Sequence, residues 1–129
     1  MIKSEPASYS WDDLVAEGGT EWTGVRNATA AINLRAMQVG DDVFYYHSMT
    51  DKAIVGRARV ARTARPDGEG ERWVSVRVEP VDKLERPVTL AEIKADPRLA
   101  DMELLRQSRL SVAPVRAAEW KHIEALARR

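Results

Sequence analysis

The 129-residue chain contains no cysteine and only two histidines, His47 and His122. The absence of cysteine excludes disulfide bonds, thiolate-bound zinc and cysteine nucleophiles, and nothing indicates an oxidising compartment. Because the two histidines lie far apart in the sequence, a histidine-rich metal site is not expected. We therefore predict neither a metal ion nor a cofactor.

Long apolar runs are also missing. The first six residues, M-I-K-S-E-P, lack the apolar stretch of a signal peptide, and no segment is long and apolar enough to span a membrane. We therefore expect a cytoplasmic protein that does not contact a membrane. The length predicts a single domain over residues 1–129. We expect a monomer, although the sequence leaves the oligomeric state open.

An excess of charge of either sign is absent as well, because 20 basic side chains balance 20 acidic ones. A protein that binds nucleic acid regardless of sequence is normally basic, since neutralisation of phosphates supplies its affinity. Five basic side chains nevertheless fall within residues 51–65: Lys52, Arg57, Arg59, Arg62 and Arg65. They form either a strip that contacts phosphates or the solvated face of a strand. We name Arg57 and Arg59 as the candidate phosphate contacts.

The usual catalytic motifs do not occur. There is no G-x-S-x-G turn, no phosphate-binding glycine loop and no H-E-x-x-H pair. Asp41 and Asp42 fit a turn that opens a strand better than a pair of catalytic carboxylates. His47 could act as an acid or base, but a histidine that is hydrogen-bonded at the end of a strand is the favoured interpretation. We therefore predict no catalytic residue.

The segments that are present predict an α+β domain. Capping residues and helical spacing predict helices over residues 10–18, 27–37, 89–96 and 117–127. Compact or alternating apolar segments predict strands over residues 42–47, 53–62 and 73–79, and residues 108–113 are short and β-like. The Asp67–Gly68 turn should join the second and third strands as an antiparallel pair.

Short strands between helices favour a small curled sheet over a large flat one. We predict a closed or nearly closed β-barrel of about five or six strands with flanking helices. Its inward-facing side chains should be Ile54, Val60, Val74, Val76 and Val78.

The segment W-T-G-V-R-N, residues 22–27, combines an aromatic ring with polar donors. Trp22 could belong to the core or its rim, while Arg26 and Asn27 could form a surface ion pair and a helix cap. An aromatic face beside amide, hydroxyl and cationic donors also suits a planar heterocycle, which stacks on the ring while its edge is hydrogen-bonded. Both interpretations remain open from the segment alone.

Further motifs occur together with this segment, in a consistent order along the chain. They are K-S-E-P (3–6), F-Y-Y-H-S (44–48), P-V-T-L-A-E-I-K (87–94) and S-R-L-S-V (108–112). With W-x-G-V-R-N, they make the chain resemble the EVE domain family over nearly its whole length. The resemblance implies a PUA-like fold, a small β-barrel with flanking helices. It also implies kinship with the thymocyte nuclear proteins and with YTH domains, which hold a methylated adenine in an aromatic cage.

The resemblance implies a base-sized pocket, with Trp22 stacking on the base. The residues at the matching positions are Lys3, Ser4, Glu5, Pro6, Trp22, Gly24, Val25, Arg26, Asn27, Tyr46, His47, Ser48, Ser108, Arg109, Leu110 and Ser111. The implied function is a binding module that reads a modified base in DNA or RNA, so the expected partner is nucleic acid carrying such a base.

Two alternatives to this function remain. The first is an enzyme acting on a modified nucleotide or base, with His47 and Glu5 transferring protons. The second is a protein-interaction module whose pocket is vestigial.

Overall fold

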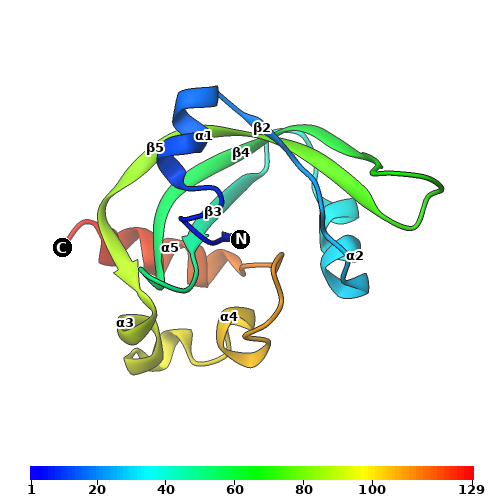
Figure 1. Ribbon diagram of the computed structural model, residues 1–129. Coiled ribbons are helices and arrows are strands. Elements are labelled where there is room, and N and C mark those ends of the chain that lie inside the picture. The colour runs from blue at the N-terminus through cyan, green and yellow to red at the C-terminus, as the bar shows by residue number, and fades with distance from the viewer.

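The computed structural model describes residues 1–129 and shows a five-stranded mixed sheet with helices packed around it (Figure 1). The strands are β1 (Ile2–Ser4), β2 (Thr20–Trp22), β3 (Asp42–His47), β4 (Ala53–Pro66) and β5 (Val74–Thr89). The helices are α1 (Trp11–Glu17), α2 (Ala28–Ala36), α3 (Leu90–Ala95), α4 (Glu103–Arg106) and α5 (Ala117–Ala127), with a 3₁₀ turn η1 (Pro97–Leu99). The predicted α+β class is confirmed. None of the helices has the length and apolar character that a membrane crossing requires.

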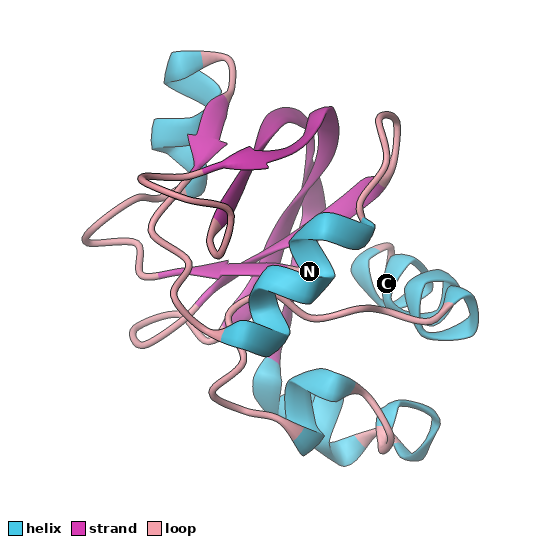
Figure 2. Cartoon of the chain, turned by 90° about the vertical axis from the view of Figure 1, so that its right-hand side faces the viewer, coloured by secondary structure: helices cyan, strands magenta, loops and turns pink.

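The strands lie in the order β1-β3-β4-β5-β2, with β1 parallel to β3 and the other pairs antiparallel. The predicted hairpin around Asp67–Gly68 is confirmed, and it is extended by long, bent β4 and β5 strands (Figure 1). The closed barrel is a wrong prediction, because β1 and β2 are the two edges of the sheet and do not pair with each other. With three residues each, these edge strands are too short to complete a barrel wall (Figure 2).

Two hydrophobic clusters contain the buried side chains. Helices α1 and α2 contribute to an 18-residue cluster, whereas α3, α4 and α5 contribute to a cluster of 13 residues. Successive side chains of strand β3 point alternately into the two clusters. Tyr45 lies in the larger cluster, and Phe44 and Tyr46 lie in the smaller one. This alternation follows from the two-residue period of a strand.

The predicted inward-facing side chains are all buried. The larger cluster contains Val60, Val74, Val76 and Val78, whereas Ile54 lies in the smaller one. The pairing of β4 with β5 shifts register between Ile54 and Gly56. Such a bulge inserts an extra residue and reverses the alternation, so Ile54 faces away from Val60.

Local capping holds the helix starts as the sequence predicts. Ser10 and Asp13 form a reciprocal capping box at α1, and Thr89 and Glu92 form one at α3. The Asn27 side chain accepts a hydrogen bond from the Ala30 N–H at 2.9 Å and so caps α2. This cap fixes the direction in which the chain leaves the 22–27 segment.

Gly56 lies directly under the ring of Trp11, the first residue of α1. A Cβ atom added to Gly56 would lie 2.7 Å from the ring atoms Cε3 and Cζ3 of Trp11. The absent side chain therefore leaves the space in which the buried Trp11 packs.

Candidate nucleic-acid interface

Three of the predicted site segments lie side by side at the β1 edge of the sheet. Strand β1 pairs in parallel with β3, so that Lys3 lies opposite Tyr46 and Ser4 lies opposite His47. On its other side, the Lys3 N–H donates to the Ser111 carbonyl at 3.0 Å. The structure therefore brings together segments 3–6, 46–48 and 108–111, as the resemblance implies.

These segments do not, however, present all their side chains to one pocket. Tyr46 belongs to the smaller hydrophobic cluster, and the Lys3 ammonium lies 5.9 Å from the centre of its ring. The His47 ring instead lies edge-on to Tyr45, which belongs to the larger cluster, at 5.8 Å. Because side chains alternate along a strand, neighbouring candidate residues face opposite sides of β3.

Trp22 belongs to an aromatic group on the side of the larger cluster. Its half-buried ring meets Tyr45 edge-on at 5.7 Å and Tyr9 at 6.3 Å. The Tyr45 hydroxyl donates to the Tyr9 carbonyl at 3.0 Å and lies beside the Ser4 side chain. Burial raises the pKa of Tyr45 to about 12, so this hydroxyl keeps its proton at neutral pH.

His47 joins α1 to the turn between β3 and β4. Its Nε2 accepts a hydrogen bond from the Trp11 N–H at 2.9 Å, and its Nδ1 lies 2.7 Å from an Asp51 carboxylate oxygen. Because Nε2 accepts, the ring proton of neutral His47 must lie on Nδ1 and point to Asp51. The predicted role as a hydrogen-bonded histidine at a strand end is confirmed. Both ring nitrogens are engaged, which leaves neither free for the proton transfer that the enzyme alternative requires.

The 22–27 segment is held by the tip of the β4–β5 hairpin. Asp67 accepts hydrogen bonds from the Gly24 N–H at 2.9 Å and from the Arg26 guanidinium at 3.0 Å. The side chain of Val25, which lies between Gly24 and Arg26 in the sequence, is buried. The Arg26 guanidinium also lies 5.7 Å from the centre of the Trp73 ring. The ion pair of Arg26 and the helix cap of Asn27, which the sequence left open as one interpretation, are both present. The Asn27 amide nitrogen makes no hydrogen bond within the chain.

We expect Asp67→Ala to loosen this segment, with a loss of about 1 kcal/mol of stability, because the hydrogen bonds from Gly24 and Arg26 are removed. The Gly24 N–H and then the Arg26 guanidinium lower the pKa of Asp67. A depressed carboxyl pKa stabilises the fold above the unfolded value, and this contribution is lost as the pH falls through the folded pKa. The stability difference between the wild type and Asp67→Ala should therefore shrink in acid, as urea titrations at several pH values would measure.

Glu69→Ala is the matched control for this variant. Glu69 is exposed in the same hairpin tip and forms no ion pair or side-chain hydrogen bond. Equal effects of the two substitutions would contradict a specific role for Asp67.

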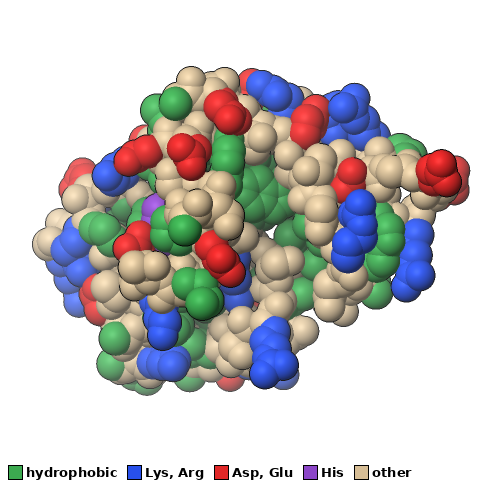
Figure 3. Space-filling model, in the orientation of Figure 1, with side chains coloured by type: hydrophobic (Ala, Val, Ile, Leu, Met, Phe, Trp, Pro, Cys, Tyr) green, Lys and Arg blue, Asp and Glu red, His purple; other side chains and the backbone are tan.

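Two adjoining cavities lie along the 108–110 segment. The first, of about 350 Å³, is lined by Asn27, Thr29, Arg106, Gln107, Ser108, Arg109 and Leu110. The second, of about 570 Å³, is lined by Lys3, Tyr46, Ser48, Met49, Lys52, Leu90, Lys94, Ala100, Leu104, Leu105 and Ser108. Ser108 belongs to both. Figure 3 shows the hollowed face, with Lys and Arg side chains predominating over its lower part.

Arg57 and Arg59 line neither of these cavities. Arg57 is paired with Asp82 and Glu124, and Arg59 with Asp42. These pairs agree with the solvated strand face that the sequence left open. A phosphate role for either arginine stays a prediction, and it would require the guanidinium to exchange a carboxylate for a phosphate.

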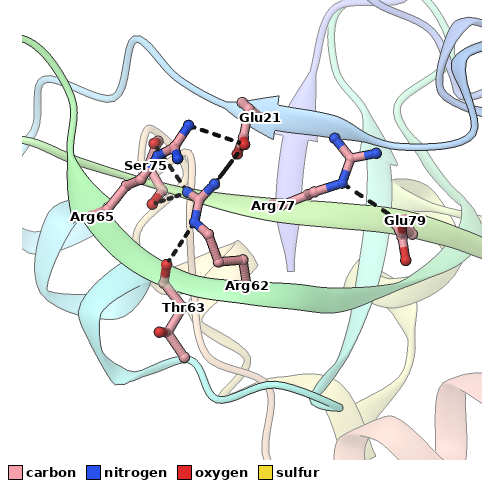
Figure 4. A network of polar contacts seen from close by, with 7 residues as sticks. All are labelled: Glu21, Arg62, Thr63, Arg65, Ser75, Arg77 and Glu79. Carbon is pink, nitrogen blue, oxygen red and sulfur yellow. Dashed lines mark hydrogen bonds and ion pairs between the residues drawn. The ribbon is translucent and has the colours of Figure 1, made fainter.

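The rest of the arginine strip is paired in the same way. The Arg62 guanidinium binds both carboxylate oxygens of Glu21, at 2.5 and 2.6 Å, and Arg65 reaches the same carboxylate at 3.3 Å (Figure 4). Acidic residues from other strands and from α5 thus neutralise the four arginines of the run, whereas Lys52 forms no ion pair.

Several residues of the site were missed by sequence reasoning. Tyr9, Trp11 and Tyr45 complete the aromatic group around Trp22, and Lys94 joins Lys52 in the larger cavity. The alternation along β3 could have separated Tyr45 from Tyr46. Lys52 stood out only as part of the basic run, and nothing in the sequence linked it to Lys94, because a turn and a helix meet only in the tertiary fold.

The fold and this edge define a small α+β module with an aromatic group on one face of β3 and a cavity lined by lysines on the other. The EVE domain family model matches residues 1–126, and the chain belongs to that family. A solved structure of a Rhodopseudomonas palustris protein is 49% identical and superposes with a TM-score of 0.93, over 98% of this chain and 90% of that one.

Two further relatives match most of the chain. The structure of human THYN1 protein in complex with 5-methylcytosine-containing DNA is 29% identical, with a TM-score of 0.93, over 99% of this chain and 96% of that one. An uncharacterised Schizosaccharomyces pombe protein is 35% identical, over 91% of this chain but only 58% of its own length. The chain thus spans little more than half of that relative.

Proposed function

We propose that this protein is a binding module for DNA that carries a modified base, and that 5-methylcytosine is the first base to test. The observation that carries the proposal is the similarity, over nearly the whole of both chains, to the human protein in complex with 5-methylcytosine-containing DNA. Membership of the EVE domain family supports it.

The aromatic group offers the chemistry that such a base needs. Trp22 is only half-buried, so part of its ring surface is available for stacking. The Asn27 amide lacks a partner for its N–H donors and could bond the base edge, as could Ser4 beside Tyr45. A methyl group would fill apolar space that an unmodified base leaves empty. In this proposal the base leaves its stack before it binds.

Titration of fluorescently labelled oligonucleotides by anisotropy tests the proposal. Duplex and single-stranded DNA with one 5-methylcytosine would be compared with the same sequences carrying cytosine, and with the matching RNA. Since one methyl group in an apolar site is worth about 1–3 kcal/mol, we expect at least about a tenfold preference for the methylated DNA. Equal affinity for methylated and unmethylated DNA would contradict recognition of this base.

The same samples distinguish the alternatives. Mass spectrometry of the nucleosides after incubation would detect chemical turnover, which would favour an enzyme. Absence of binding to any oligonucleotide, across a panel of other modified bases, would favour a protein-interaction module.

A further inference from the structure

The two cavities that share Ser108 are lined by basic residues, although the protein as a whole has a net charge of zero. The larger contains three lysines and no acidic residue, and the smaller contains two arginines and no acidic residue. By contrast, the cavity beside Arg57 also contains Asp82, Glu85 and Glu124. Arg106 of the smaller cavity is paired with Glu103 at 3.7 Å, but Arg109 and the three lysines of the larger cavity form no ion pair within the chain.

The lysines of the larger cavity have no anionic partner within the chain. Lys52 and Lys94 form no ion pair or side-chain hydrogen bond, unlike Arg57, Arg59, Arg62 and Arg65. Lys3 donates only to the Ser108 carbonyl, at 3.1 Å, and burial lowers its pKa. Lys3 is half-buried, and its ammonium group has no carboxylate to offset the loss of hydration. An anion that enters the cavity would relieve this cost.

The backbone holds one of these lysines in an unfavourable conformation. Met49 and Lys52, in the turn between β3 and β4, have φ angles of 66° and 49°, in the left-handed region. The Lys52 carbonyl accepts a hydrogen bond from the Leu90 N–H, at 2.7 Å, where α3 begins. Strained residues that the surroundings hold in place are often part of a functional site. Here the turn that holds Lys52 in this conformation brings it into the lining of the same cavity as Lys94 of α3.

We propose that the cavity of Lys3, Lys52 and Lys94 binds the sugar–phosphate backbone of the strand that carries the recognised base. This inference rests on the proposed function and adds a path for the strand. The occupant is a nucleic-acid strand because basic side chains continue past Ser108 to Arg106 and Arg109, giving a site larger than a single phosphate needs. Leu104 and Leu105 give the larger cavity an apolar wall against which a deoxyribose can pack.

The test uses the double variant Lys52→Ala/Lys94→Ala, because both side chains are exposed and their loss should not unfold the protein. Affinity for the methylated oligonucleotide would be measured over a range of salt concentrations. Each lost phosphate contact lowers the slope of log K against log salt by about 0.7–0.9, so we expect a total change of up to about 1.8. Binding should weaken by up to about a hundredfold at roughly 0.05 M salt and about tenfold at roughly 0.2 M.

Lys83→Ala/Arg128→Ala is the matched control, because it removes the same charge from the cavity that also contains acidic residues. It should leave the slope nearly unchanged. The preference for methylated over unmethylated DNA should be the same in all three proteins, because phosphate contacts position the strand without reading the base.

The outcomes separate the two proposals. If the wild type prefers methylated DNA but the Lys52/Lys94 variant keeps its salt slope, the strand path is wrong and the proposed function stands. If the variant loses the preference for the methylated base, the lysines belong to the base pocket and the strand path is also wrong. If the wild type binds no DNA, the proposed function fails and the strand path fails with it. If inorganic phosphate at matched ionic strength displaces the oligonucleotide completely, the cavity is a site for a free anion instead.

Discussion

Replacing Trp22 with alanine should abolish the preference for methylated DNA and should also destabilise the protein. From the sequence alone, a Trp22 that lines a pocket predicts little loss of stability, whereas a core tryptophan predicts a loss of about 3–5 kcal/mol. The structure places Trp22 between these cases, half-buried against the larger cluster with its ring edge-on to Tyr45 and Tyr9. We therefore expect an intermediate loss of about 1–3 kcal/mol.

The loss of binding should exceed what this destabilisation explains. Stacking of one base on an aromatic side chain is worth about 1–3 kcal/mol, so affinity should fall roughly 5- to 150-fold. The measurement pairs an anisotropy titration with urea unfolding at a temperature where the variant remains folded.

Two further substitutions of Trp22 separate stacking from packing. Trp22→Phe keeps an aromatic face and should retain the preference for the methylated base with a few-fold weaker affinity. Trp22→Leu keeps apolar volume against Tyr45 but offers no aromatic face, so it should be nearly as stable as Trp22→Phe and yet bind weakly. If the leucine and phenylalanine variants bind equally well, Trp22 acts through packing alone.

Replacing Gly56 with alanine should destabilise the protein by about 3 kcal/mol, and valine should cost more. The added Cβ would lie 2.7 Å from the ring of Trp11, and the bend of β4 at this bulge fixes the backbone. Relief would require Trp11 to move, which would break the hydrogen bond from its N–H to His47. Urea unfolding measures the loss, and the near-ultraviolet circular dichroism of the tryptophans should change with it.

Gly40→Ala is the control for the loss of a glycine without a steric clash. Gly40 has a φ of 92° but has open space where a Cβ atom would lie. Its substitution should lower the free energy of unfolding by about 1 kcal/mol or somewhat more, because alanine disfavours a positive φ angle. Comparable losses in the two variants would show that the close approach of Trp11 to Gly56 can relax cheaply.

The features that the sequence predicts well are those that depend on neighbouring residues. Capping at Ser10, Asn27 and Thr89 is local chemistry, and so is the hairpin turn at Asp67. The closed barrel fails because closure depends on the lengths of edge strands far apart in the chain. Ile54 is assigned to the wrong face because a bulge leaves no mark in the apolar alternation.

The candidate site shows the same division. The motifs at residues 3–6, 46–48 and 108–111 do meet, as the family resemblance implies. Their side chains separate onto two faces of β1 and β3, which a list of matching positions cannot express. The pairing of Arg57 with Glu124 of α5 is likewise invisible in sequence, since the partners are 67 residues apart.

An open sheet has two free edges, and exposed edges invite pairing with a second copy of the chain. Here β1 is covered on its outer side, because the Lys3 N–H bonds Ser111 and the Ala113 N–H bonds Met1. The other edge, β2, is only three residues long and has the ion-paired Glu21 at its centre. Neither edge offers a long, flat, apolar template for aggregation. The sheet thus gains without closure the protection against edge-to-edge association that a barrel provides by closing.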